Sequence, residues 1–210
     1  MLTKYTEKIL ILGAGGFIGK SLFNSFRESG FDVTGTARSG GHIHLDILKD
    51  NWKKTILKEN PSVIINCIAY GNSQHHKHSE KIKNISYEFP KELIEFCHDK
   101  LSLKAFVQLG SSSEYGKNCK GADELFDLEP NSEYSIQKGR LSEFSHGFAY
   151  TFNFPLVYFR LFSVYGGFEP DIRLIPTLID KAKKGMFPDL GSHEVSRDFI
   201  HIDDVVTAIH

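Results

Sequence analysis

The sequence has few cysteines, no long apolar segment and almost no excess charge. Its three cysteines, Cys67, Cys97 and Cys119, are widely spaced and odd in number, which is typical of a reducing cytosol rather than of a disulfide framework. A formal net charge of −1 indicates no basic surface for nucleic acid or for an anionic membrane. The longest apolar runs, such as 63–69, have the length of a strand, well short of the roughly 20 residues that a membrane span needs. The N-terminal MLTKYTEK lacks the apolar core of a signal peptide, so we expect a soluble, cytoplasmic protein.

What the sequence does contain is a regular alternation of strand-like and helix-like segments. Strands are predicted at 8–12, 31–37, 42–45, 62–69, 103–109 and 156–161, and helices at 20–29, 51–59, 80–100 (kinked near Pro90) and 132–152. Such alternation predicts parallel pairing with right-handed crossovers. We therefore expect an α/β fold built on a doubly wound parallel sheet. After 165 the pattern is less regular, with a helix predicted at 174–184, a short strand at 198–202 and a helix from Asp203.

Glycines cluster at the first strand-to-helix turn, in the stretch ILILGAGGFIGKSL. Gly13 would allow the tight turn, Gly16 would let a pyrophosphate approach the backbone, and Gly19 would let the helix pack closely on the strand. The helix N-terminus would then present unpaired N–H groups and its positive dipole end to the phosphates. The sequence predicts a dinucleotide site here, with Phe17 and Ile18 between the glycines. A glycine-rich loop without function is the alternative.

The end of the second predicted strand indicates the type of dinucleotide. An acidic residue there would bind the adenosine ribose hydroxyls, but this strand ends at Arg38. A guanidinium suits a 2′-phosphate, so NADP(H) is favoured and NAD(H) remains possible; a solvated arginine is the alternative. Asp46 is placed either to meet the adenine amino group or to cap the next helix. Ile47 and Ala69, after the third and fourth strands, complete the predicted cofactor set.

A tyrosine and a lysine four residues apart, in YSIQK, form the candidate catalytic pair. On a helix, Tyr134 and Lys138 lie on one face, one turn apart. A nearby ammonium favours the phenolate, so we expect Lys138 to lower the pKa of Tyr134 toward a value useful for proton transfer. Ser111 follows the fifth predicted strand, at the sheet edge where ligands of open α/β sheets bind, and could hydrogen-bond a substrate carbonyl. A chance tyrosine and a solvated lysine are the alternative.

The chain resembles a known family through five motifs: GAGGFIG, the serines of GSSSEYG, YSIQK, RLFSVYG and RDFIHIDDVV. In order and spacing they are similar to those of the extended short-chain dehydrogenase/reductase superfamily, and more narrowly to the NAD-dependent epimerase/dehydratase group that acts on nucleotide sugars. The resemblance implies a Rossmann domain over 1–165 and a substrate-binding subdomain, present in part over 166–210. It also implies a homodimer built on the helices at 80–100 and 132–152.

The resemblance further implies roles for single residues. Ser111 and Tyr134 would act at the reacting carbonyl or hydroxyl, and Lys138 would bind the nicotinamide ribose. Phe162 and Val164 would lie near the nicotinamide.

The substrate-binding residues implied in the same way are Asn84, Ser112, Ser163 and Arg197. Arg197 would contact the substrate diphosphate, which an arginine also suits on physical grounds. Asn84 matches a structural asparagine near the active site, with an exposed helix residue as the alternative. Ser163 stands where many relatives carry an asparagine that touches the substrate phosphate.

The expected reaction follows from the residues after Ser111. Dehydratases of this family carry an acidic pair there, whereas this chain has Ser112 and Ser113, with Glu114 one place later. Arg38 favours NADPH, and GSSSEYG resembles the version of this motif in reductases of 4-keto-6-deoxy nucleotide sugars, so we expect NADPH-dependent reduction of a nucleotide-linked 4-keto-6-deoxy sugar. A 4-epimerase that retains NAD is the alternative, and a non-catalytic dinucleotide-binding module is a third possibility.

A metal site is not expected. His75, His76 and His78 cluster after the fourth predicted strand, but no further ligand follows at a familiar spacing. A solvated loop is expected there, with substrate contact as the alternative.

Overall fold

The structure, a computed structural model, describes residues 7–40, 42–71, 78–117, 119–187, 190 and 196–210. The strands are β1 Lys8–Leu12, β2 Asp32–Ala37, β3 Ile43–His44, β4 Val63–Asn66, β5 Ala105–Leu109, β6 Leu156–Phe159, β7 Ser163–Tyr165 and β8 Phe199–His201. The helices are α1 Phe17–Glu28, α2 Trp52–Glu59, α3 Ser79–Lys83, α4 Phe89–Lys100, α5 Glu133–Phe152, α6 Leu174–Lys183 and α7 Ile202–Ile209. A π-helical turn, η1 Asn84–Glu88, joins α3 to α4, and a 3-10 turn, η2 Ser112–Tyr115, follows β5.

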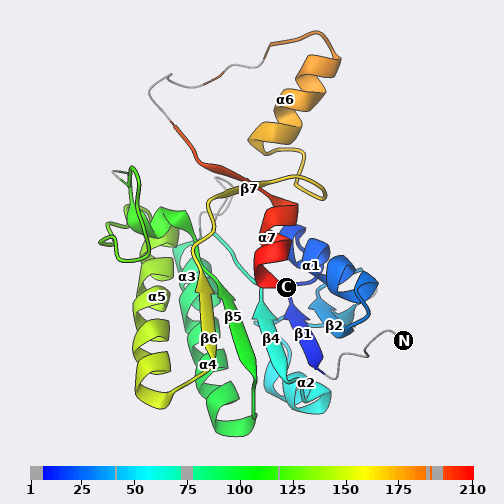
Figure 1. Cartoon of the computed structure of the whole chain (residues 1–210), viewed down its shortest axis with the longest axis vertical. Helices are drawn as coiled ribbons and strands as arrows, with labels where there is room; N and C mark the ends of the chain where they lie inside the picture. The colour runs from blue at the N-terminus through cyan, green and yellow to red at the C-terminus, as the bar shows by residue number, and fades with distance from the viewer. Residues whose placement is uncertain (1–6, 41, 72–77, 118, 188–189, 191–195) are drawn as a thin grey trace.

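The six strands β1 to β6 form one parallel sheet in the order β3-β2-β1-β4-β5-β6. This confirms the predicted doubly wound sheet. The strand order reverses between β1 and β4, and the crevice above such a reversal is where open α/β sheets bind ligands. In Figure 1 the carboxyl ends of these strands point toward β7, which crosses above them. The candidate residues that follow β1, β2, β4 and β5 therefore share one edge of the sheet.

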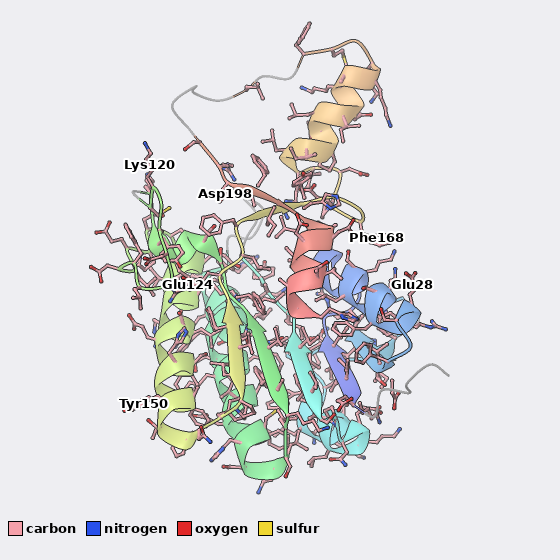
Figure 2. All side chains as sticks on the ribbon, in the orientation of Figure 1. Glu28, Lys120, Glu124, Tyr150, Phe168 and Asp198 are labelled. Carbon is pink, nitrogen blue, oxygen red and sulfur yellow. The ribbon has the colours of Figure 1, made fainter. Side chains whose placement is uncertain are left out.

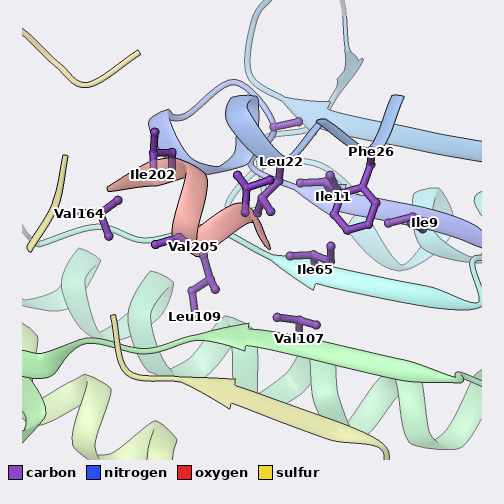
Figure 3. Packing of buried hydrophobic residues seen from close by; sticks show 12 residues of the cluster. Ile9, Ile11, Leu22, Phe26, Ile65, Val107, Leu109, Val164, Ile202 and Val205 are labelled. Atoms are coloured by element: carbon purple, nitrogen blue, oxygen red, sulfur yellow. The ribbon is translucent and has the colours of Figure 1, made fainter. Parts of the chain in front are cut away.

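Helices cover both faces of the sheet and bury its strands. Along β1, Ile9 and Ile11 face α1 and α7, while Leu10 and Leu12 face α2 and α4. Figure 3 shows the packing of the sheet face that is covered by α1 and α7. Its buried residues include Ile9, Ile11, Ile65, Val107, Leu109, Leu22, Phe26, Val164, Ile202 and Val205. This two-sided burial is why strands of an all-parallel sheet are apolar at successive positions.

The last described segments lie partly away from the sheet. β7 pairs in parallel with β8, and α6 stands above the strand ends in Figure 1, whereas α7 returns to pack beside α1. α6, all of whose residues are described, buries none of them. None of the helices in the described ranges is long and apolar enough to cross a membrane. The division at residue 165 and the homodimer stay predictions.

Two predicted boundaries differ from the structure for local reasons. α1 begins at Phe17, after Gly16 as N-cap, rather than at residue 20, so Gly19 lies within its first turn. β4 ends at Asn66 rather than at residue 69. The Asn66 amide donates to Gln108 on β5 at 2.9 Å and its oxygen accepts the Ile68 N–H at 3.1 Å, which turns the chain out of the sheet.

The helix predicted at 80–100 contains the π-helical turn η1. Here the Phe89 N–H donates to the carbonyl of Asn84, five residues back, instead of four. Pro90 follows and has no N–H to continue the α-helical ladder. The Ser86 hydroxyl, on η1, donates to the Tyr70 carbonyl at 2.7 Å and fastens the turn to the loop after β4.

The packing of α1 on β1 predicts opposite effects for two glycine substitutions. A Cβ at Gly19 would lie 2.3 Å from the Gly13 carbonyl oxygen. Because the atom that the new Cβ would meet is part of the backbone and cannot easily move aside, Gly19→Ala should lower the free energy of unfolding by about 1–3 kcal/mol. Gly147 in α5 has nothing within 4 Å of an added Cβ, so the matched Gly147→Ala should raise it by up to about 1 kcal/mol. Urea denaturation checks both, and equal effects would contradict the packing described.

Candidate active site

The glycine turn holds its backbone directly against the end of β2. Gly13 has φ +81°, which a side chain would disfavour, and the N–H groups of Gly13 and Ala14 both donate to the Thr36 carbonyl, at 3.0 and 2.9 Å. A Cβ at Gly15 would lie 2.9 Å from the Ala37 Cβ. The turn is therefore flat and free of side chains where it meets the sheet edge. Sequence analysis missed the need for Gly15, since the motif counts only Gly13, Gly16 and Gly19.

The N-terminus of α1 suits a phosphate group. Gly16 is its exposed N-cap residue, and no side chain in the described part of the molecule caps the helix. The first helical N–H groups and the positive dipole end thus face the crevice without a carboxylate in the first turn. Phe17 and Ile18 are half-buried and pack on the core below. These features fit the pyrophosphate of a dinucleotide.

The residues predicted at the adenosine end lie beside this turn. Arg38 is exposed at the end of β2. The Asp46 carboxylate accepts the Leu48 N–H at 3.1 Å, and α2 is capped by Asn51, which accepts the Lys54 N–H at 3.2 Å. The capping alternative for Asp46 is therefore wrong.

The other predicted cofactor residues differ in exposure. Ala69 is exposed after β4, and Ile47 packs on the core beneath α2 and α4. Phe162 is half-buried, with its ring 6.3 Å from that of Tyr115. Val164 is 3% exposed and packs with Ile202, so its side chain belongs to the core and only its backbone can face a cofactor.

The structure brings Ser111, Tyr134 and Lys138 together where β5 ends and α5 begins. Ser111 is the N-cap of η2; its hydroxyl lies 2.8 Å from the Ser113 hydroxyl and close enough to the Tyr134 phenol to act on its pKa. Lys138 is 1% exposed, and its Nζ donates to the Leu109 carbonyl at 2.7 Å. A Cβ at Gly71 would lie 3.0 Å from the Tyr134 ring, so the loop after β4 packs against the phenol. This arrangement can donate and accept a proton at a substrate oxygen.

The pKa values of this set contradict one expectation. Burial raises the pKa of Tyr134, the Glu114 carboxylate raises it further, and the hydrogen bond from Ser111 opposes them. Burial lowers the pKa of Lys138 to about 8, while Glu114 and then Cys67 act to raise it. The expected lowering of the Tyr134 pKa by Lys138 was wrong for this structure, because burial and then the Glu114 carboxylate raise that pKa, and the Lys138 ammonium donates to the Leu109 carbonyl.

A buried ion pair beside the three residues was not predicted. Glu114 is 0% exposed and accepts the Nε–H of Arg160 at 3.1 Å. Arg160 comes directly after β6 and also donates to the Tyr115 hydroxyl at 3.1 Å and the Ser142 hydroxyl at 2.9 Å. A charged residue directly after an apolar strand needs a partner, and this was the sequence signal that could have revealed the pair.

The predicted substrate residues surround the crevice without forming one pocket. Asn84 opens η1 and lines a concavity of about 550 Å³. The Ser112 N–H donates to the Leu161 carbonyl at 2.9 Å, the Ser163 N–H donates to the Asp198 carbonyl at 3.0 Å, and Arg197 is exposed before β8.

A second concavity, of about 370 Å³, lies between Phe162 and α7. Among the described residues, neither concavity is lined by Ser111, Tyr134 or Lys138. The candidate active site is therefore defined by the position of those three residues at the end of β5 and the start of α5, and not by either concavity. His75 and His76 lie outside the described residues, and within the described ranges no three potential ligands gather as a metal site would need.

Comparison with known proteins gives one family over nearly the whole chain. Residues 9–210 match the profile of the NAD dependent epimerase/dehydratase family. CDP-abequose synthase of Salmonella typhimurium is 28% identical over 225 residues, 99% of this chain and 70% of the relative. The uncharacterized UDP-glucose epimerase YtcB of Bacillus subtilis is 28% identical over 96% of this chain and 71% of its own.

Solved structures share the fold. MoeE5 in complex with UDP-glucose and NAD superimposes with a TM-score of 0.81 at 26% identity, covering 96% of this chain and 70% of MoeE5.

The buried ammonium predicts an unusual pH dependence of stability. The pKa of Lys138 is lowered from 10.5 to about 8, so between these values the unfolded chain holds a proton that the folded chain has released. The free energy of unfolding should then rise with pH, by about 1.4 kcal/mol per unit from this group. Relative to Lys138→Met, the free energy of unfolding of the wild type should rise by about 3 kcal/mol across this pH range. Urea denaturation of both proteins at several pH values measures the difference, and parallel curves would contradict it.

Proposed function

Because the chain belongs to the NAD-dependent epimerase/dehydratase family, we propose that it is a nucleotide-sugar 4-epimerase that works with bound NAD. The observation that carries the proposal is the contact of Ser111 with Tyr134 above the buried Lys138, next to an uncapped helix N-terminus that suits pyrophosphate. The relative named as a UDP-glucose epimerase supports the choice of reaction, and MoeE5, solved with UDP-glucose and NAD, supports the choice of ligands.

In this reaction the chain positions the sugar and moves one proton. Tyr134, as the phenolate, would take the proton of the C4 hydroxyl while C4 is oxidised, and would return it when the keto sugar is reduced on its other face. The Ser111 hydroxyl would hydrogen-bond the same oxygen, and Lys138 would hold the nicotinamide ribose and stabilise negative charge on the phenol. NAD would supply the hydride acceptor and donor. Phosphates of the cofactor would lie on Gly16 and the first turn of α1.

NADPH-dependent reduction of a 4-keto sugar, the reaction favoured from the sequence, is the second candidate. Two observations favour it: Arg38 is exposed at the end of β2, where it could bind a 2′-phosphate, and the raised pKa of Tyr134 keeps the phenol in its proton-donating form.

The two reactions are separated by the cofactor that the purified protein carries and uses. A 4-epimerase should release NAD on denaturation and convert a UDP-sugar into its C4 epimer without net use of cofactor. A reductase should consume added NADPH stoichiometrically with a keto-sugar. If neither reaction occurs with any UDP-, CDP-, GDP- or dTDP-sugar, both proposals fail.

Replacing the phenol tests the catalytic assignment. Tyr134→Phe removes the proton-transferring hydroxyl and should lower turnover roughly 10²–10⁴-fold, with NAD binding retained. Tyr150→Phe is the matched control, since Tyr150 lies on the same helix, 93% exposed on the outer side of the molecule in Figure 2. Chromatography of the product sugars measures both variants. Equal turnover in the two would show that Tyr134 is not part of the chemistry.

Replacing the arginine at the end of β2 tests the cofactor. If Arg38 binds a 2′-phosphate, Arg38→Ala should weaken NADPH binding by about tenfold, the value of one charge-assisted hydrogen bond, and leave NADH unchanged. Arg27→Ala, at the far end of α1, is the control. Fluorescence titration gives both dissociation constants. Equal effects on NADPH and NADH would remove the reason for preferring NADP(H).

A further inference from the structure

The buried carboxylate of Glu114 has no part in the reaction just described. Its side chain is 0% exposed on η2. One oxygen accepts the Ser111 N–H at 2.7 Å and lies 3.1 Å from the Tyr158 hydroxyl, and the other accepts the Arg160 Nε–H at 3.1 Å. Burying an ion pair costs several kcal/mol per ion before pairing. Such a group at the edge of a reacting set needs an explanation beyond stability.

The partners of Glu114 join both sides of the site. On the η2 side it holds the backbone of Ser111. On the other side, the Tyr158 hydroxyl is also 3.3 Å from the Lys138 carbonyl, and Arg160 donates to the Ser142 hydroxyl on α5 at 2.9 Å. One carboxylate therefore connects the strand-end serine to two points on the helix that carries Tyr134 and Lys138.

The charge of Glu114 acts on the same residues. It favours the ammonium of Lys138 and disfavours ionisation of Tyr134. Cys67, the other group that acts on Lys138, stays neutral near pH 7 because burial raises the pKa of its thiol to about 12. Tyr158 is held in its neutral form by burial and by Glu114. Burial raises the pKa of Glu114 itself, while the Ser111 N–H, Lys138, Tyr158 and Arg160 all favour its charged form.

We propose that Glu114 is a positioning residue, which ties Ser111 to α5 and provides the counter-charge that keeps the buried Lys138 protonated. The inference deepens the proposed function, since it rests on Ser111, Tyr134 and Lys138 being the reacting set. An ammonium in an apolar site would otherwise lose its proton near neutral pH, and with it the ability to stabilise charge on the phenol.

The charge is tested with Glu114→Gln, which keeps an oxygen to accept the Ser111 N–H but removes the negative charge. NMR of isotope-labelled lysine, with the Lys138 signal assigned from Lys138→Met, gives the Lys138 pKa directly. We expect it to fall by roughly one unit, below its starting value of about 8. Glu143→Gln, which removes an exposed carboxylate from α5, the helix that carries Lys138, should leave the Lys138 pKa unchanged. A merely structural Glu114 predicts the reverse, because loosened packing admits water and raises the Lys138 pKa toward 10.5.

The positioning of Ser111 by Glu114 is tested with Glu114→Asp. This variant keeps the negative charge, but its side chain is one methylene too short to reach all the hydrogen-bond partners of Glu114. The Lys138 pKa should stay near 8, while amide hydrogen exchange at Ser111 becomes about tenfold faster, the loss of roughly one hydrogen bond. Unchanged protection of Ser111, or a Lys138 pKa that moves by a unit, overturns the proposal. This variant decides the matter if Glu114→Gln does not fold. Both readouts need no substrate, so a protein without epimerase or reductase activity would overturn the proposed function and leave this inference standing.

Discussion

The site depends on an ammonium group that is held where water cannot reach it. Lys138 lies under the junction of β5 and α5, and its ammonium donates to the main-chain carbonyl of Leu109 on β5. A carbonyl oxygen carries only a partial negative charge. The full negative charge that favours the ammonium form of Lys138 comes from the carboxylate of Glu114. The positions of η2, β6 and α5 relative to one another therefore serve an electrostatic requirement as well as packing, and the reacting oxygens of Ser111 and Tyr134 are placed by the same contacts.

The glycine turn and Lys138 lie at the same edge of the sheet because of the strand order. β1 and β4 are neighbours at the reversal of the strand order, and β5 follows β4, so loops far apart in the sequence share one edge. On that edge the structure supplies a helix terminus suited to phosphates and a phenol suited to proton transfer. The raised pKa of Tyr134 means that the resting site is a proton donor, which suits carbonyl reduction; an epimerase must in addition draw a proton from the sugar during each cycle.

The sequence was sufficient to predict the sheet and to identify the glycine turn and the Tyr134–Lys138 pair as candidates, because each depends on local spacing. Strand periodicity, the glycine intervals and the four-residue spacing of Tyr134 and Lys138 are all visible in one dimension. The pair of Glu114 and Arg160 was not visible, since its members are far apart in the chain and meet only when β5 and β6 align. The pKa of Tyr134 was mispredicted because it depends first on burial and then on Glu114, and the spacing of Tyr134 and Lys138 reveals neither.

The π-helical turn at 84–88 holds one residue more than a regular helical turn would. Ile82 before it and Leu93 after it are both buried. If the same residues wound as a uniform α-helix, with none removed, one flank would rotate against the other by about 100°. One of the two anchors would then face solvent. The π-helical turn thus absorbs one extra residue while both flanks keep their apolar faces toward the core, and the loss of that one residue would be tolerated if the segment returned to α-helical hydrogen bonds.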